Sequence, residues 1–442
     1  MVMSESLEAQ KILRKWKGSS YVFGERVLNK VGELTKLFGK RTLLVISASP
    51  WVEEPRKIIE RSLEKSGISY TIVNGARANA PREDVYRITF QVTMYRPDSI
   101  IAVGGGSTID ACKAASVLAT YSSSDVSRVL NVKWDVAGTI DPYFGTGLVT
   151  KVRDATKKDL ITIIAVQTGA SSGAHLTKYS NITDLVTKQK KLIVDDALVP
   201  KAAIFDYSLT IGTPKNLTID GGFDGVAHVW EVFAGAVGKS YYEEVKRIAK
   251  LGISLIVKNL KFAVENPGDI KARTALGLGT DLGGYAIMIG GTSGPHLGSF
   301  SLVDVLTHGR ACWILNPYYT VFFSTSIQDQ LRTMAPIFKE AGFIKEGDLE
   351  GLEGRILGET VAEGMIGFTK SLGAPTTLRE AGATDEHLIR MLSAARDPQL
   401  KMKLMNMPVP MDPDKGDLEM YMKPLLEAAF TGNLKLVKAY KP

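Results

Sequence analysis

The amino-acid sequence predicts an α/β domain followed by an all-helical domain, and three observations support that prediction. The chain has 442 residues, a length at which a single hydrophobic core stops growing and two domains are expected. In the first half, short β-branched runs alternate with amphipathic stretches, which is typical of a parallel sheet covered by helices. After about Asp206, strand signals give way to apolar residues at three- and four-residue spacing. We therefore expect an α/β domain over 1–205 and a helical domain over 206–442.

The elements of the first half follow one another in βαβαβ order. The expected strands are 42–47, 69–73, 99–103 and 160–166, and the expected helices are 55–67, 84–95 and 107–118. Two further β-prone runs, 179–183 and 191–194, are separated by a polar turn and predict a hairpin. The second half is predicted to be helical over 224–237, 243–262, 271–289, 301–314, 327–341, 349–372 and 385–393.

The composition excludes several classes of protein. Hydrophobic residues make up 45% and charged residues 23% of the chain, which rules out wholesale disorder, collagen and coiled coil. The two cysteines, Cys112 and Cys312, are too few for a disulfide scaffold or a four-cysteine zinc site. The net charge is +7, but the basic residues are dispersed, so no nucleic-acid partner is expected. The segment Met1–Trp16 is polar and the apolar runs are short, so we expect a soluble cytoplasmic protein without a signal peptide or membrane span.

A run of glycines follows directly on the strand expected at 99–103. Glycines allow the backbone to approach a diphosphate closely, and the following helix N-terminus favours negative charge. The run is neither GxGxxG nor a P-loop, so ATP phosphoryl chemistry is not expected. A structural turn is the competing interpretation, and the position in a βαβ unit favours nucleotide binding. The residues of this loop are Gly104, Gly105, Gly106, Ser107 and Thr108.

A second loop of small residues, 167–175, follows the strand expected at 160–166. Open parallel sheets bind ligands at the carboxyl ends of their strands, so two such loops predict a bound dinucleotide. The loop ends in His175, for which a surface position is the expected one and proton relay the alternative.

Three of the five histidines follow a pattern that suits a metal site. Asp224 and His228 are four residues apart and lie on one face of a predicted helix. His296 and His308 are twelve residues apart, a turn of about 120°, so they do not share one face of a straight helix. One carboxylate oxygen with three imidazoles suits Fe²⁺, Zn²⁺, Mn²⁺ or Co²⁺. Each histidine alone is more often structural, and Asp304, four residues before His308, offers a competing arrangement.

Motifs between about residues 20 and 430 occur in a fixed order, and this order resembles the iron-containing (group III) alcohol dehydrogenase family, which has the dehydroquinate synthase-like fold. The most specific are the glycine loop with Asp110 and Lys113 and the pair Asp224 and His228. The others are 23–24, 195–200, 206–210, Glu231 and 372–380. The resemblance implies an N-terminal Rossmann-like nucleotide-binding domain and an all-α C-terminal metal-binding domain.

The resemblance also implies an activity and its residues. It implies reversible hydride transfer between an alcohol carbon and NAD or NADP, with the substrate alkoxide held by Fe²⁺ or alternatively Zn²⁺. The implied metal ligands are Asp224, His228, His296 and His308, and the implied catalytic residues are Asp224, His228 and His308. The implied cofactor-binding residues are Ser47, Gly104, Gly105, Gly106, Ser107, Thr108, Asp110, Lys113, Thr168 and Ser172. The expected partner is a small alcohol or aldehyde, and a homodimer is the default assembly.

The sequence departs from the family pattern at the metal site and at the first strand. The last two ligand histidines are commonly fourteen residues apart with another histidine four after the first, whereas here the position four after His296 is Phe300. If His296 matches that other histidine, the third ligand falls near Thr292, which has no imidazole. Ser47 stands where the family often has an aspartate that binds the ribose, so NADP is tolerated as well as NAD. A dehydroquinate-synthase-like or glycerol (phosphate) dehydrogenase-like enzyme is the alternative.

Overall fold

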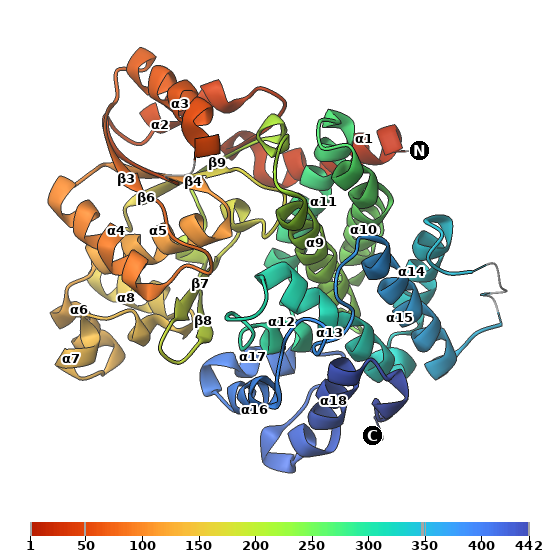
Figure 1. The fold of residues 1–442 in the computed structure, drawn as a ribbon. Coiled ribbons are helices and arrows are strands. Elements are labelled where there is room, and N and C mark those ends of the chain that lie inside the picture. The colour runs from red at the N-terminus through yellow and green to blue at the C-terminus, as the bar shows by residue number, and fades with distance from the viewer. Residues whose placement is uncertain (1, 48–49, 346–348, 350, 441–442) are drawn as a thin grey trace. The chain divides into compact units, whose positions relative to one another are not determined.

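The computed structural model describes residues 2–47, 50–345, 349 and 351–440 (Figure 1). The chain divides into two compact units, one comprising Ile12–Thr213 and the other Met1–Lys11 with Pro214–Pro442. The first is α/β and the second is helical, as the sequence predicts. The domain boundary expected after residue 205 stays a prediction.

The α/β unit is built on a six-stranded parallel sheet with the order β1-β9-β6-β4-β2-β3. Its strands are β1 (Tyr21–Gly24), β2 (Arg41–Ile46), β3 (Ser69–Asn74), β4 (Ser99–Gly104), β6 (Thr162–Gln167) and β9 (Ala202–Asp206). The strands β2, β3, β4 and β6 confirm the predicted βαβ pattern. The prediction missed β1 and β9 because both are short and give no extended β-branched run.

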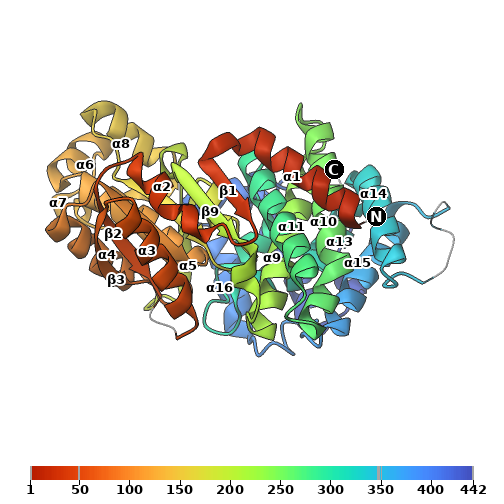
Figure 2. The same ribbon diagram turned by 90° about the horizontal axis from the view of Figure 1, so that it is seen from above.

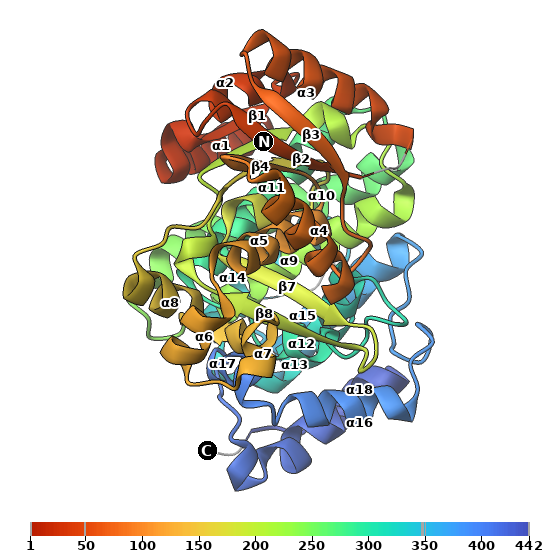
Figure 3. The same cartoon turned by 90° about the vertical axis from the view of Figure 1, so that its left-hand side faces the viewer.

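Helices cover both faces of this sheet, so that the unit has two hydrophobic cores (Figure 3). On one face lie α2 (Val31–Lys36) and α3 (Glu53–Lys65), whose Ile59 and Leu63 are fully buried. The other face carries α4 (Arg82–Tyr95), α5 (Gly106–Thr120), α6 (Ser123–Leu130), α7 (Trp134–Ala137) and α8 (Leu148–Thr156).

The predicted hairpin is confirmed as an antiparallel pair, β7 (Tyr179–Asp184) and β8 (Gln189–Val194). The two-residue strand β5 (Gly145–Thr146) adds in parallel to β8 and completes a three-stranded sheet.

The second unit contains helices and no strand in the part of the chain that the structure describes. Its helices are α9 (Lys215–Gly235), α10 (Tyr242–Glu265), α11 (Ile270–Ile289), α12 (Gly294–Ser299), α13 (His308–Phe323), α14 (Gln328–Glu340), α15 (Gly354–Ser371), α16 (Asp385–Ala394), α17 (Lys401–Met405) and α18 (Lys423–Thr431). Helices α9, α10 and α11 pack side by side (Figures 1 and 2). A Cβ added to Gly279 would lie 2.6 Å from Ile256 Cγ1, so glycine allows this close approach of α11 to α10.

Three helix predictions in this unit are corrected. The helix expected at 349–372 begins at Gly354, and residue 350 of that range lies outside the described residues. The helix expected at 301–314 begins only at His308, because Thr307 is extended (φ −66°, ψ 152°) and starts the helix as its cap residue. The helix expected at 224–237 begins earlier, at Lys215, directly after Pro214. Asp224 and His228 consequently lie in the middle of α9, where both are buried.

The N-terminal segment, predicted only to be polar and charged, forms the helix α1 (Val2–Lys17). Its first part belongs to the helical unit, where Ser254 Oγ donates to Glu5 Oε1 (2.9 Å) and Arg247 Nε lies 2.8 Å from Glu8 Oε1. Ala9 and Leu13, four residues apart, are fully buried and are the sequence signal for this helix. Within the described ranges, no helix combines the length and apolar character needed to cross a bilayer.

Candidate metal centre

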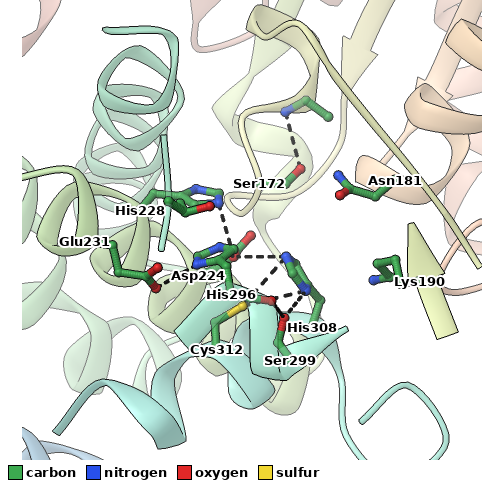
Figure 4. Close-up of polar contacts among 12 residues, drawn as sticks. Ser172, Asn181, Lys190, Asp224, His228, Glu231, His296, Ser299, His308 and Cys312 are labelled. Atoms are coloured by element: carbon green, nitrogen blue, oxygen red, sulfur yellow. Dashed lines mark hydrogen bonds and ion pairs between the residues drawn. The ribbon is translucent and has the colours of Figure 1, made fainter. Parts of the chain in front are cut away.

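Helix α9 presents Asp224 and His228 one turn apart in the interior of the helical unit. Both side chains are buried, and His228 Nε2 lies 3.5 Å from Asp224 Oδ1 (Figure 4). Burial lowers the pKa of His228 to about 4, which the charge of Asp224 only partly opposes. The imidazole is therefore neutral at neutral pH, the form that binds metal ions.

His296 and His308 come to the same carboxylate from two other helices. His296 lies on the short helix α12, and its Nε2 is 3.7 Å from Asp224 Oδ1. His308 is the first residue of α13, and its Nε2 is 3.8 Å from the same oxygen. The rings of His228 and His296 stack with centroids 4.8 Å apart. The structure thus brings together all four residues that the sequence selects as metal ligands.

The donor atoms of this cluster fit a divalent cation. Asp224 Oδ1 and His296 Nε2 are buried and have no hydrogen-bond partner, although buried polar atoms are normally satisfied. Metal–ligand bonds of 2.0–2.1 Å place the ligands of a tetrahedral ion about 3.3–3.4 Å apart, only a few tenths below the observed separations. Burial opposes ionisation of Asp224, but the three surrounding imidazoles hold the pKa of its carboxyl well below the usual range. A cation would satisfy these donors.

Cys312, which the sequence analysis did not select, also lies in this cluster. It is fully buried one turn after His308 on α13. Its Sγ, Asp224 oxygen and one nitrogen each of His296 and His308 all lie within 4.8 Å of one another. The sequence signal for it was the H-x-x-x-C spacing from His308, which repeats the D-x-x-x-H spacing on α9.

Glu231, one turn beyond His228 on α9, orients His296. Its Oε1 lies 2.6 Å from His296 Nδ1, and its carboxylate accepts hydrogen bonds from Ser293 N (2.8 Å) and Asn316 Nδ2 (3.2 Å). Burial raises the pKa of the Glu231 carboxyl, but His296 outweighs this and lowers it. An ionised Glu231 holds the proton on Nδ1 and fixes the ring, so that Nε2 is turned toward Asp224.

The competing arrangements from the sequence do not form. Asp304 accepts a hydrogen bond from Arg390 Nη2 (2.6 Å) and is not part of the cluster. Thr292 accepts a hydrogen bond from the buried Lys403 and offers no imidazole. His296, and not Thr292, therefore lies in the position of the third histidine ligand.

Replacing Glu231 by glutamine is expected to weaken metal binding about tenfold, because partners that orient a ligand histidine typically contribute 10–100-fold in affinity. Competition with a chromophoric chelator measures the dissociation constant. The exposed Glu243, in the first turn of α10, provides the matched control as Glu243→Gln. An unchanged affinity in the Glu231 variant contradicts the orienting role.

The glycine loop connects β4 to α5 as predicted, and its middle residue is open. A Cβ added to Gly104 would lie 2.8 Å from Thr108 Cβ, and one on Gly106 would lie 2.7 Å from Ser172 Oγ. No atom lies within 4 Å of a Cβ added to Gly105, the residue that precedes the first turn of α5. The backbone before the first turn of α5 is therefore open at Gly105, where the sequence predicts that a diphosphate approaches.

The second loop lies beside the first, because β6 is the neighbour of β4 in the sheet. Thr168 N donates to Gly104 O (3.1 Å), and Ser172 Oγ accepts from Ala174 N (3.3 Å). Ser47, the remaining predicted cofactor residue of the sheet edge, follows the end of β2 and is half-buried.

Asp110 and Lys113, both buried on α5, bind the strand β7 and the end of the second loop, respectively. Asp110 Oδ2 accepts from the backbone and side-chain nitrogens of Asn181 (3.0 and 3.1 Å). Lys113 Nζ is fully buried and donates to the carbonyl oxygens of Ala174 (2.7 Å), Thr177 (2.7 Å) and Tyr179 (2.8 Å). Three acceptors use all three hydrogens of an ammonium group, so Lys113 fixes the backbone after the second glycine loop.

Replacing Lys113 by methionine is expected to destabilise the protein by about 2 kcal/mol, because three buried carbonyl oxygens lose their donor while the burial of a charge is relieved. The change should also loosen the second loop and, if the predicted cofactor binds there, raise the dissociation constant for NAD(P)H. Thermal denaturation and cofactor fluorescence measure the two effects. Lys65→Met, at an exposed position on α3, is the control. If the two variants have the same stability and the same cofactor affinity, Lys113 does not anchor the loop.

His175 is buried, which corrects the expectation of a surface position. Its Nε2 lies 3.2 Å from Tyr21 Oη, and its ring packs edge-on against Phe205 with centroids 5.6 Å apart. Tyr21 and Phe205, which cover the ring, belong to β1 and β9, the two strands that the sequence did not predict.

Comparison with known proteins agrees with this architecture. Residues 18–207 match the iron-containing alcohol dehydrogenase family, and residues 218–413 match the C-terminal domain of the Fe-containing alcohol dehydrogenase family. The NAD-dependent methanol dehydrogenase of Bacillus methanolicus is 24% identical over 370 residues, covering 83% of this chain and 89% of that protein. The long-chain-alcohol dehydrogenase 1 of Geobacillus thermodenitrificans is 29% identical over 339 residues, 76% of each chain.

The fold is also found in solved structures. The alcohol dehydrogenase from Oenococcus oeni superimposes with a TM-score of 0.76 at 24% identity, over 93% of this chain and 98% of that one. The two family matches together span most of the sequence, one in each structural unit. The protein is therefore an oxidoreductase that belongs to the iron-containing alcohol dehydrogenase family.

Proposed function

We propose that the protein is a metal-dependent, NAD(P)-linked alcohol dehydrogenase or aldehyde reductase, which transfers a hydride between an alcohol carbon and the nicotinamide. The convergence of three imidazoles on the unpartnered Oδ1 of Asp224 is the observation that carries this proposal. The methanol and long-chain alcohol dehydrogenases among the relatives support a small alcohol or aldehyde as the substrate.

Asp224, His228, His296 and His308 would hold Fe²⁺ or alternatively Zn²⁺. When bound, the metal supplies Lewis-acid polarisation of the alcohol oxygen. Asp224 would contribute the negatively charged oxygen donor, and the three imidazoles would contribute nitrogen donors. The side chain of His308 is 23% exposed, against 5% or less for the other three. We therefore assign the substrate to the His308 side, with Asp224, His228 and His308 as the catalytic residues.

The glycine loops would bind the cofactor diphosphate. The open position at Gly105 and the first turn of α5 supply backbone N–H groups. Lys113 holds the end of the second loop beside them, and Asp110 holds the strand β7 that follows it. Ser47 leaves the end of β2 without a carboxylate, which supports the use of NADP as well as NAD. The further side chains proposed for the cofactor site are Ser107, Thr108, Thr168 and Ser172.

The contacts of Arg310 favour a dehydrogenase over a dehydroquinate-synthase-like lyase. A lyase of that kind needs cationic side chains that hold a phosphate and a carboxylate. Arg310 is the cation next to the cluster in the sequence, and its guanidinium is bound to Asp220 (2.8 and 2.9 Å). We also propose a cytoplasmic homodimer, in keeping with the sequence expectation.

The test compares the wild-type protein with His228→Ala, measuring bound metal and NAD(P)-linked oxidation of a panel of primary alcohols. The variant is expected to lose both, because the neutral imidazole next to Asp224 is removed. His387→Gln, at a histidine that packs on α16 outside the cluster, is the control. Retention of metal and activity in His228→Ala would refute the assignment.

A further inference from the structure

We propose that Cys312 is an additional ligand of the metal centre, so that a sulfur joins the oxygen and nitrogen donors. Asp224, His296 and His308 belong both to this group of donors and to the metal ligands of the proposed function. The inference rests on the proposed function for the presence of a divalent cation. Sulfur adds to the proposed ligands and replaces none of them.

Helix α13 presents Cys312 to the cluster in the same way that α9 presents its own pair. His308 and Cys312 are one turn apart on α13, as Asp224 and His228 are on α9. Glycine at position 309 allows the two helices to come together here, since a Cβ on it would lie 2.9 Å from Asp224 Cβ. The two pairs therefore face one another across a single small space (Figure 4).

The sulfur is close to His308 but lies off the axis of a hydrogen bond. Cys312 Sγ is 3.7 Å from Nδ1 and 3.8 Å from Nε2. A thiol that donates along the in-plane lone pair of one ring nitrogen is much farther from the other nitrogen. The two nearly equal distances place the sulfur to the side of both lone pairs, so neither contact fixes the direction of the thiol.

A metal ion as a further partner of the sulfur is indicated by two other buried donor atoms. Asp224 Oδ1 and His296 Nε2 have no hydrogen-bond partner, and each of these residues is 3% exposed. Both residues belong to the same group of mutually close donors as Cys312. Bonds of about 2.3 Å to sulfur and 2.0–2.1 Å to nitrogen allow Cys312 Sγ and His308 Nε2, which lie 3.8 Å apart, to reach the same ion.

A thiolate changes the chemistry of the site. On binding, the Cys312 thiol releases its proton to solvent and its sulfur forms the bond to the cation, with no change in oxidation state. Thiolate is a softer ligand than carboxylate or imidazole, so it favours Zn²⁺, Co²⁺ and Fe²⁺ over Mn²⁺ and Mg²⁺. The centre would consequently discriminate among divalent metals more strongly than an oxygen-and-nitrogen set.

The test is the absorption spectrum of the full-length protein loaded with Co²⁺. Sulfur ligation gives an intense near-ultraviolet charge-transfer band, whereas oxygen and nitrogen ligands give only weak visible bands. The chain has two cysteines, and Cys112 is fully buried in the core of the α/β unit. Cys112→Ser is therefore the matched control for Cys312→Ser, and Cys312→Ala serves if the serine variant does not fold.

We expect the near-ultraviolet band in the wild type and in Cys112→Ser, and its loss in the Cys312 variants while the visible bands persist. Visible bands without the charge-transfer band in the wild type overturn the sulfur ligand and leave the proposed metal centre standing. Absence of bound cobalt overturns both. The ¹¹³Cd resonance of the cadmium-loaded wild type is a check that needs no variant: a shift typical of oxygen and nitrogen ligands alone contradicts the proposal.

Discussion

Asp224→Asn is expected to reduce metal affinity by more than about a hundredfold and to abolish NAD(P)-linked activity. Loss of a direct ligand exceeds the 10–100-fold effect of the partners that orient ligands, and Asp224 Oδ1 is the atom that all three imidazoles approach within 3.8 Å. The asparagine amide has almost the same shape, so the packing of α9 is retained while the charge is lost. Elemental analysis after gel filtration measures the bound metal.

Asp304→Asn is the matched control for this change. Asp304 lies four residues before His308 and is bound to Arg390 outside the cluster. Its variant should keep the metal and the activity of the wild type. If Asp304→Asn lost the metal and Asp224→Asn retained it, Asp304 would be the metal ligand in place of Asp224.

Gly309→Ala is expected to give the largest loss of stability among the variants discussed, about 3 kcal/mol. The added Cβ would lie 1.9 Å from Asp220 O, a backbone atom that cannot move aside without displacing α9. Overpacking of this kind typically destabilises by 1–3 kcal/mol and more where backbone is displaced, which outweighs the gain of about 1 kcal/mol in helix propensity. Because His308 and Asp224 flank the contact, metal affinity should fall as well.

Thermal denaturation of the metal-free protein separates the packing effect from the loss of metal. Gly268→Ala is the control, since no atom lies within 4 Å of a Cβ at that position. A Gly309→Ala variant as stable as this control would show that α9 and α13 do not require the close approach.

The sequence predicted the parts of the fold that carry strong periodicity. The central strands β2, β4 and β6 are continuous apolar runs buried on both faces, which is typical of parallel strands. The strand β9 and helix α1 were missed because their signals are weak: β9 has five residues, and α1 buries only a narrow stripe on a polar helix. The start of α13 depends on Thr307 adopting an extended conformation, which local propensity does not specify.

At the candidate site, spacing predicted what lies on one helix and not what two helices bring together. The pair Asp224 and His228 follows from a four-residue interval. The contribution of Cys312 depends on the packing of α13 against α9, and the contact between Glu231 and His296 joins α9 to α12. Such contacts depend on how the helices pack in the tertiary structure, and the spacing of residues along the sequence does not predict them.

The most direct test of the account is the activity of the wild-type protein before and after removal of its metal. NAD(P)H consumption with a panel of aldehydes is measured on the purified protein, on the protein after exhaustive dialysis against a chelator, and after reloading with Fe²⁺ or Zn²⁺. The expected result is activity that disappears with the metal and returns on reloading. Cofactor consumption that continues undiminished in the metal-free protein would contradict it.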